Sequence, residues 1–129
     1  MAIWAIVPAA GIGARMNSEM PKQYLAINGQ SVIAHTLQRL AGLADLRATV
    51  IALHPQDSLW AQHGVALHEG LMTCSGGEQR CQSVLNGLYA LAGLANDDDW
   101  VLVHDAVRPC VRLEDIETLL REVENHPVG

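Results

Sequence analysis

Short apolar runs alternate along this chain with stretches in which apolar residues recur every three or four positions. The clearest runs are Ala2–Val7, Ala48–Leu53 and Trp100–His104, a weaker run lies near Val65–His68, and Leu71–Thr73 is ambiguous. Runs of this length between turn-forming residues are typical of buried strands. The alternation therefore predicts strand–helix–strand units and a Rossmann-like, doubly wound, mostly parallel α/β sheet.

Three stretches have the periodicity of amphipathic helices. The first runs from Ile33 to Ala44, with Ser31 placed as its N-cap, and the third covers Ile116–Val123, with acids in its first turn where the helix dipole favours them. A short helix is also predicted within Pro55–Gly64. The second helix has an apolar stripe that consists of Cys81, Val84, Leu85, Leu88, Leu91 and Ala92.

The first apolar run leads into a glycine-rich segment, residues 8–24, which reads PAAGIGARMNSEMPKQY. Gly11 and Gly13 lack a Cβ, so the backbone can turn sharply and present N–H groups to an anion. Arg15 and Lys22 follow, and Lys22 is the only lysine of the chain. Together these features predict a nucleoside triphosphate site, with an ordinary strand-to-helix turn as the alternative.

Two other phosphate-binding loops fit this segment poorly. A dinucleotide-binding turn needs a third glycine for close helix–strand contact, and Met16 stands at that position. A Walker-type loop needs Gly-x-x-x-x-Gly-Lys-Ser/Thr, which the segment lacks. A dinucleotide-dependent oxidoreductase is therefore disfavoured.

A second candidate segment, His104-Asp-Ala-Val-Arg-Pro109, follows the last apolar run. Asp105 at the end of a buried strand is suited to hold Mg²⁺, which prefers one or two carboxylates together with phosphate oxygens. Arg108 matches the geometry of a phosphate on a second substrate. Since ligands of doubly wound sheets lie at the carboxyl ends of the strands, this segment can meet the glycine-rich loop. The alternative is that Asp105 caps the next turn and pairs with Arg108.

A third segment, Ser75-Gly-Gly-Glu-Gln-Arg80, opens the second helix. Its two glycines allow the backbone to approach a planar base or a ribose closely. Ser83, in the first turns of the helix, can add a hydroxyl. A plain glycine turn is the alternative, so this segment becomes informative only together with the other two.

Composition restricts the classes of function. The chain has 129 residues, which suits a single domain, and a net charge of −6, which argues against a nucleic-acid surface. An odd number of cysteines (three) without metal-ligand spacing favours a reducing compartment, and we expect the cytoplasm. No apolar stretch approaches about 20 residues, so neither a membrane span nor a signal peptide is expected. The run Asp97–Asp99 is expected to be a solvated loop.

With these segments placed, the chain resembles the 2-C-methyl-D-erythritol 4-phosphate cytidylyltransferases of the non-mevalonate isoprenoid pathway. The match lies in the order and spacing of its motifs, and it spans the whole chain. The matching segments are Pro8-Ala-Ala-Gly-Ile-Gly-Ala-Arg-Met16, Pro21-Lys-Gln-Tyr24, Gly76-Gly-Glu-Gln-Arg80 with Ser83-Val84, and Val103-His-Asp-Ala-Val-Arg-Pro109.

The resemblance implies a nucleotide-diphospho-sugar transferase type of fold and a reaction in which CTP and methylerythritol phosphate give CDP-methylerythritol and pyrophosphate. It also implies roles for individual residues. Arg15 and Lys22 would stabilise the transition state, Ala9, Ala10 and Gly11 would contact CTP, and Gly77, Glu78 and Ser83 would recognise cytosine. Asp105 would hold Mg²⁺ near the second substrate, and Arg108 would contact methylerythritol phosphate.

One departure from the family is length. Family members are considerably longer, and this chain stops at His126–Gly129, where another strand would begin. The family forms homodimers through an arm that we expect this chain to lack, together with a second lysine near the phosphates. We therefore expect an N-terminal portion with weak or absent turnover.

Two further alternatives share many of these features. Another nucleotidyltransferase, such as a sugar-phosphate or ribitol-phosphate cytidylyltransferase, would have the same glycine-rich loop and strand-end acid. A nucleotide-binding module without catalysis would need neither Lys22 nor Arg15 directed at a leaving group. Competing alcohol phosphates would distinguish the first alternative.

Overall fold

The computed structural model describes residues 2–11, 21–65, 67, 70–108, 110 and 112–123. Strands and helices alternate along these residues as the apolar pattern predicts. In chain order the elements are β1 (Ile3–Ala9), the 3-10 helix η1 (Lys22–Tyr24), β2 (Ala26–Ile27), β3 (Gln30–Ser31), α1 (Val32–Ala41), β4 (Leu46–Leu53), α2 (Trp60–His63), β5 (Leu71–Ser75), α3 (Arg80–Leu91), β6 (Trp100–Val103) and α4 (Leu113–Val123).

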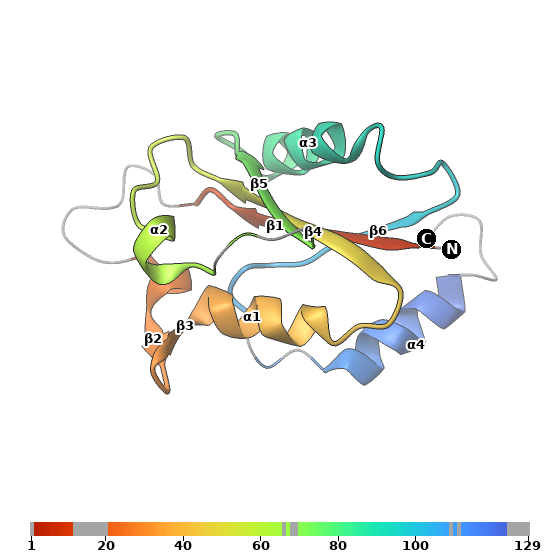
Figure 1. Cartoon of the computed structure of the whole chain (residues 1–129), viewed down its shortest axis with the longest axis horizontal. Helices are drawn as coiled ribbons and strands as arrows, with labels where there is room; N and C mark the ends of the chain where they lie inside the picture. The colour runs from red at the N-terminus through yellow and green to blue at the C-terminus, as the bar shows by residue number, and fades with distance from the viewer. Residues whose placement is uncertain are drawn as a thin grey trace.

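The main sheet has the strand order β5-β4-β1-β6, and all its pairs are parallel. Helix α3 covers one face of this sheet, and α1 and α4 lie on the other face (Figure 1). After β1 the chain builds β4 and β5 on one side, and it then returns to place β6 on the other side. The predicted doubly wound parallel α/β sheet is thus confirmed, with its change of direction at β1.

The sheet opens at the carboxyl end of β1. This strand pairs with β4 as far as Ala9, but it pairs with β6 only as far as Ile6. The last bond on the β6 side is donated by the His104 backbone N–H to the Ile6 carbonyl, at 3.0 Å. Pro8 lies beyond this point, where its missing N–H deprives no β6 partner of a bond. The opening is the place where doubly wound sheets bind ligands.

Alternation along β1 and β4 divides the core into two layers. Val7 and Ile51 pack on the side of α1 with Ile33, whereas Ile6 and Val50 pack with α3. The predicted N-cap of α1 is also present, because the Ser31 hydroxyl accepts a hydrogen bond from the Ala34 N–H at 3.2 Å. Each face of the sheet therefore has its own apolar layer.

The predicted stripe on α3 is partly wrong. The face of α3 that packs on the sheet is centred on Ser83, Gly87 and Leu91, while Cys81, Leu85 and Leu88 are exposed. Gly87 explains the difference, because a Cβ there would lie 2.8 Å from Ile6 Cγ2. Helix α3 approaches β1 through a small residue, which a search for large apolar side chains does not detect.

Three smaller features differ from what the sequence predicted or left open. The ambiguous run is a strand, extended to Leu71–Ser75, whereas Val65 and Leu67 are not in a strand and Ala66 and His68 lie outside the described residues. The helix expected within Pro55–Gly64 covers only Trp60–His63. A small hairpin of β2 and β3 was not predicted, although Asn28-Gly29, with φ of 53° and 85°, is a favoured sequence for its turn.

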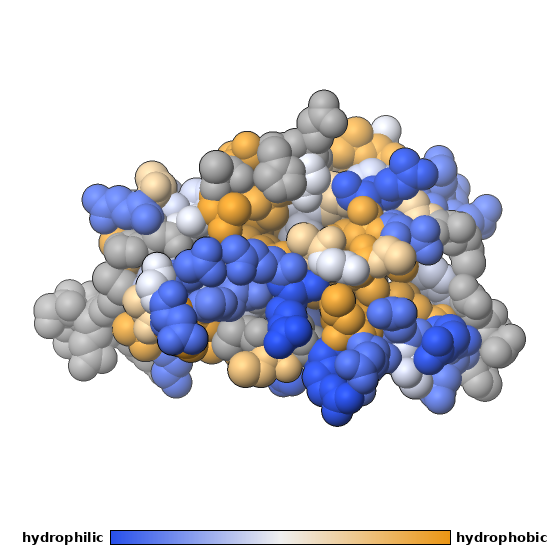
Figure 2. Space-filling view, turned by 60° about the horizontal axis from the view of Figure 1, so that its bottom comes forward, coloured by the Kyte–Doolittle hydropathy of each residue, from blue (hydrophilic) through white to orange (hydrophobic). Residues whose placement is uncertain are grey.

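Seen from the side of α1 and α4, the surface has clusters of hydrophilic side chains with a hydrophobic stretch between them (Figure 2). Helix α4 contributes to both kinds of surface, since Glu114 and Asp115 are exposed and Leu119 is also 51% exposed. None of the helices in the described part of the chain has the length and apolar character needed to cross a bilayer.

Candidate functional site

Three segments meet at the open, carboxyl end of the sheet. They are Ala10 and Gly11 after β1, residues 76–79 between β5 and α3, and residues 104–108 after β6. Two cavities lie among them. The structure therefore brings together most of the residues that the three sequence segments supply.

The smaller cavity, of about 230 Å³, lies between the β1 end and the start of α3. It contains five of the predicted nucleotide-binding residues. Ala9 does not line it, since this residue is 3% exposed and belongs to the core. The lining residues are Pro8, Ala10, Gly11, Gly77, Glu78, Gln79, Arg80 and Ser83.

The loop that forms one wall of this cavity is held by its own polar groups. The buried Ser83 hydroxyl accepts a hydrogen bond from the Gly77 N–H at 3.1 Å. Gln79 and Gln82 form a capping box at the start of α3, and Asn86 Nδ2 donates to the Ser75 carbonyl at 2.8 Å. The wall is preorganised, and the Ser83 oxygen that was expected to face a ligand orients the backbone.

The larger cavity, of about 710 Å³, lies between the end of β6 and α4. Both residues predicted for the second substrate, Asp105 and Arg108, line it. The full lining is Arg80, Leu102, Val103, His104, Asp105, Arg108, Cys110, Arg112, Asp115, Ile116 and Leu119. Its walls combine three arginines with apolar side chains, which suits a phosphorylated molecule that also has a carbon skeleton.

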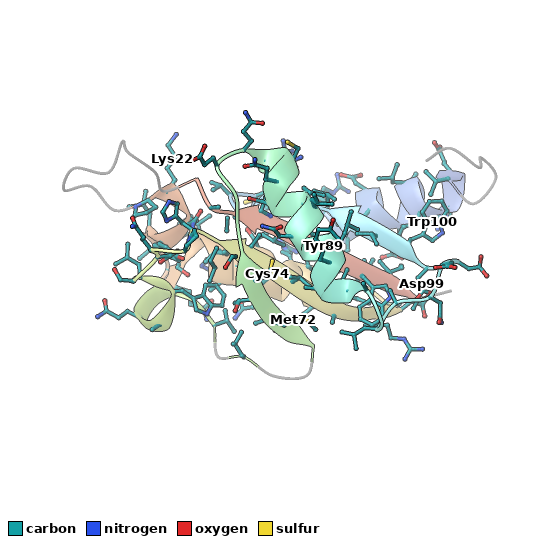
Figure 3. The ribbon with its side chains drawn as sticks, turned by 90° about the horizontal axis from the view of Figure 1, so that it is seen from above. Lys22, Met72, Cys74, Tyr89, Asp99 and Trp100 are labelled. Atoms are coloured by element: carbon teal, nitrogen blue, oxygen red, sulfur yellow. The ribbon has the colours of Figure 1, made fainter. Side chains whose placement is uncertain are left out.

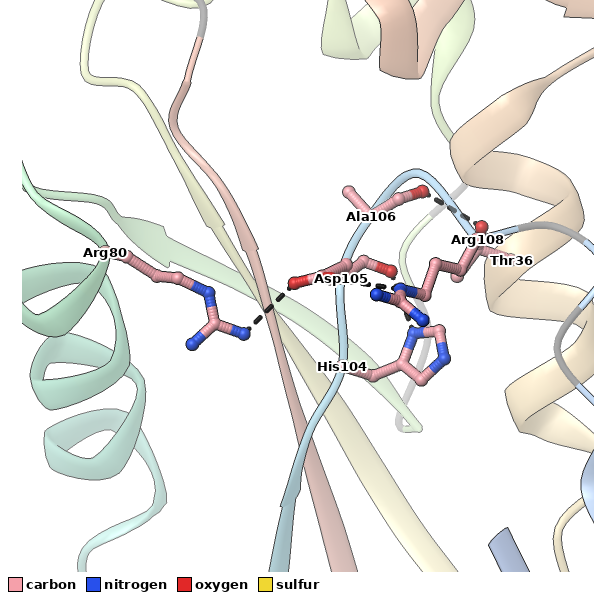
Figure 4. Close-up of polar contacts among 6 residues, drawn as sticks. All are labelled: Thr36, Arg80, His104, Asp105, Ala106 and Arg108. Carbon is pink, nitrogen blue, oxygen red and sulfur yellow. Dashed lines mark hydrogen bonds and ion pairs between the residues drawn. The ribbon is translucent and has the colours of Figure 1, made fainter. Parts of the chain in front are cut away.

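Asp105 is paired with two arginines (Figure 4). Arg80 Nη2 donates to Asp105 Oδ1 at 3.0 Å, and Arg108 Nε donates to Oδ2 at 3.1 Å. The hydrogen bond from Arg80 is the largest cause of an Asp105 pKa below its ordinary value, and the bond from Arg108 adds to it. The carboxyl is therefore charged in the pH range where proteins function.

Arg80 is the residue that sequence reasoning missed. It was read only as the last residue of the Gly76–Arg80 motif, without a role. Its position was a usable signal, because the first turn of a helix that follows a parallel strand lies at the same sheet edge as Asp105. The pair with Arg108, given above as an alternative, is present as well.

The segment that carries Asp105 is anchored to α1 and is held by a bond within itself. Thr36, fully buried in α1, donates from Oγ1 to the Ala106 carbonyl at 2.9 Å. His104 Nδ1 lies 2.8 Å from the Asp105 carbonyl, which can only accept, so this nitrogen carries the proton. Asp105 thus sits on a fixed backbone, and the arginine side chains around it are exposed.

Lys22 is the exposed first residue of η1, and its neighbours tie η1 to the end of β1. Gln23 Nε2 donates to the Ala9 carbonyl at 3.0 Å, and the Tyr24 hydroxyl is hydrogen-bonded to Asp57. Burial, with the Asp57 bond, raises the Tyr24 pKa far above its ordinary value. Lys22 lies at the opposite end of the molecule from Asp99 and Trp100 (Figure 3).

Two predicted residues, Gly13 and Arg15, lie outside the described residues. Lys22 does not line either of the two cavities. Among the residues that can be described, no group of three or more His, Cys, Asp or Glu side chains is placed to hold a metal. Asp105 offers one carboxylate, which suits a Mg²⁺ ion that takes its other ligands from phosphates and water.

Comparison with known proteins supports one family. The profile of the 2-C-methyl-D-erythritol 4-phosphate cytidylyltransferase (IspD) family matches residues 3–129. Relatives of that name are found in Photorhabdus laumondii, 50% identical over 128 residues, and in Hahella chejuensis, 44% identical over 127 residues. Each alignment covers 98% of this chain and 53% of the relative. The chain spans about half the length of the curated relatives it matches.

Solved structures give the same fold. The Francisella tularensis 2-C-methyl-D-erythritol 4-phosphate cytidylyltransferase superposes with a TM-score of 0.78 at 33% identity, covering 96% of this chain and 52% of that chain. A CMP:2-keto-3-deoxy-manno-octonic acid synthetase complexed with CTP has a TM-score of 0.72 at 21% identity, covering 99% of this chain and 49% of that chain. The second likeness is one of fold alone.

Proposed function

This chain belongs to the 2-C-methyl-D-erythritol 4-phosphate cytidylyltransferase family, and on that premise we propose that it forms the CTP-binding portion of such an enzyme. The reaction joins CTP to methylerythritol phosphate, giving CDP-methylerythritol and pyrophosphate. The observation that carries the proposal is the pair of cavities at the open end of the sheet, which share Arg80 as a wall.

The smaller cavity suits the cytosine base. Its volume of about 230 Å³ is below the roughly 300–1,000 Å³ of pockets that enclose whole drug-sized ligands. Gly77 would supply one wall for the ring, with its missing Cβ making room for Gln82. Ala10 and Gly11 would supply the opposite wall, and Glu78 also lines the cavity. Ser83 acts indirectly, because its hydroxyl holds the Gly77 amide.

Phosphate chemistry would fall to cations that the sequence motifs supply. The substrate phosphate attacks the α-phosphorus of CTP in line, and pyrophosphate leaves, so positioning and charge neutralisation dominate catalysis. Lys22, and Arg15 by family resemblance, would stabilise the charge of the transition state and the leaving group. Arg108 would bind methylerythritol phosphate in the larger cavity, where its guanidinium matches phosphate geometry.

Asp105 would hold the Mg²⁺ ion. A bound Mg²⁺ would bridge and neutralise phosphate oxygens. The Asp105 carboxylate, whose side chain is 45% exposed, would fit this role in chemistry and in place. The cytoplasmic location is part of the same proposal, whereas the homodimer of the family would depend on an arm that we expect this chain to lack.

Calorimetry of the 129-residue chain tests this function. We expect CTP to bind in a Mg²⁺-dependent way, with ATP and NAD binding at least tenfold more weakly. Lys22→Ala should weaken CTP binding about tenfold, the effect of losing one charge-assisted phosphate contact. Arg39→Ala, which removes an exposed cation from α1, is the matched control. Equal affinity for CTP and ATP, or equal effects of the two variants, would contradict the proposal.

A further inference from the structure

Arg80 is common to both cavities, and it belongs to neither loop that carries the other predicted residues. Its backbone starts α3 beside the capping box of Gln79. Its guanidinium crosses to Asp105, 25 positions later in the chain, at the end of β6. One side chain thus connects the wall of the smaller cavity with the carboxylate of the larger one.

Each oxygen of the Asp105 carboxylate already accepts a hydrogen bond from an arginine in this arrangement. Oδ1 accepts from Arg80 and Oδ2 from Arg108. A divalent cation on either oxygen would lie against a guanidinium of the same charge, which is unfavourable. A metal on Asp105 would therefore compete with an arginine for the carboxylate.

Of the two arginines, Arg80 is the one that we expect to release the Asp105 carboxylate, because its side chain joins two separate elements. Arg108 is three residues from Asp105 in the same segment, so its backbone stays beside the carboxylate. Arg80 reaches Asp105 from another element, and its side chain is 59% exposed. Both backbones are anchored, by Thr36 on one side and by Ser83 on the other, so only the Arg80 side chain has to move.

We propose that Arg80 shields Asp105 from free divalent cations and gives up the carboxylate only when a cation binds there. The two arginines outweigh the charge of the one carboxylate between them, which disfavours a bare metal ion at Asp105 even though Asp115 and Glu78 line the same cavities. A metal–triphosphate complex has net negative charge and is attracted instead. The metal is therefore admitted together with its nucleotide. The identity of that nucleotide rests on the proposed function, whereas the shielding of Asp105 does not.

Binding of Mn²⁺ alone, followed by electron paramagnetic resonance, tests the shielding. Arg80→Gln should bind Mn²⁺ about three- to fivefold more tightly than the wild type, the size expected for losing one exposed charge pair. Arg80→Lys, which keeps the charge, should behave as the wild type. The Arg80→Gln gain should vanish when Asp105→Asn is added.

Arg112→Gln is the matched control. Arg112 lines the same cavity and carries the same charge, but it pairs with Glu114. A gain equal to that of Arg80→Gln would mean that cavity charge alone is responsible, and would overturn the inference. So would unchanged Mn²⁺ affinity in an Arg80→Gln protein whose circular dichroism matches the wild type.

Repeating the titration with CTP separates the two proposals. We expect CTP to raise the Mn²⁺ affinity of the wild type by a larger factor than that of Arg80→Gln. If CTP does not bind to the wild type while Arg80→Gln still shows its gain with the metal alone, the proposed function fails and the role of Arg80 stands. If CTP binds but raises the Mn²⁺ affinity equally in both proteins, the shielding role is refuted.

Discussion

Gly76 shows how one missing side chain shapes the smaller cavity. The sequence suggested that the glycines of this loop let the backbone approach a ligand, but at Gly76 the close neighbour is the protein itself. A Cβ there would collide with Ala10 Cβ and lie 3.0 Å from Ser83 Oγ and 3.2 Å from the Leu53 carbonyl. Gly76 therefore joins the loop before α3 to the end of β1, and so brings the two walls of the cavity together.

Gly76→Ala should lower the free energy of unfolding by about 1–3 kcal/mol, the range for overpacking a close-packed site. It should also weaken CTP binding, because the loop has to move away from Ala10. Urea denaturation and calorimetry measure the two effects. Ala10→Gly in the same chain removes the worst collision and should restore part of the stability. A fully stable Gly76→Ala protein would show that the loop relaxes without cost.

Residue positions were predictable where a residue directly follows a strand at the sheet edge. Asp105 and Arg108 were placed correctly in one cavity, because strand ends converge in a parallel sheet. Ala9 was carried over from the family, but its side chain lies in the core. Arg80 was missed because an ion pair between residues 25 positions apart has no local signal in the sequence.

At the scale of elements, Asp99 fastens the start of β1 to the turn before β6. Its Oδ1 accepts from the Ala2 N–H at 3.1 Å, and its Oδ2 accepts from Trp4 Nε1 and the Asn96 N–H, both at 2.9 Å. We expected Asp97–Asp99 to be a solvated loop, but the Asp99 side chain is hydrogen-bonded to the start of β1. The bond from the Asn96 backbone is the largest cause that lowers the Asp99 pKa below its ordinary value of 3.8.

This tie predicts a pH dependence of stability. A carboxyl with a lowered pKa in the folded state stabilises the protein above its unfolded pKa, and the contribution is lost as pH falls through the folded pKa. The wild type should therefore exceed Asp99→Asn in denaturation midpoint at pH 6, and the difference should shrink below pH 3.8. Asp98→Asn, in the same loop, serves as the control. A difference that is constant or grows with acid would contradict this assignment.

The periodicity of apolar residues predicted where most helices and strands lie, but it did not predict which face of α3 packs on the sheet. The apolar stripe of α3 favoured Leu85 and Leu88, which are 47% and 42% exposed. The helix turns Gly87 to the sheet instead, since its closest approach to Ile6 leaves no room for a side chain. The β2–β3 hairpin had a signal in Asn28-Gly29, which the analysis of longer runs overlooked.

At the scale of the whole molecule, one lysine in a chain of net charge −6 makes a chemical probe. Lys22 and the terminal amine are the two amines that an amine-selective acetylating reagent can modify. With CTP and Mg²⁺ at ten times the dissociation constant, acetylation of Lys22 should slow about tenfold. The terminal amine, measured in the same mass spectrum, should react at an unchanged rate. Equal slowing at both amines would show that Lys22 is not at the nucleotide site.

The overall architecture could be predicted because parallel strands joined by helices allow few arrangements. The lateral order of the strands could not be read from the apolar runs. It depends on β1 pairing with both β4 and β6, which are separated from it by very different lengths of chain. The opening that holds the candidate site is a product of that order.

The central position of β1 has a consequence for synthesis. Of the described strands β1 is made first, yet Trp100, the partner of Ile3, is made 97 residues later. At about 5–20 residues per second, that interval lasts roughly 5–20 s. During this time one edge of β1, the hydrophobic centre of the future sheet, cannot form its native hydrogen bonds and is open to other nascent chains. The strand that organises the finished molecule is the one that nascent-chain chaperones must protect longest.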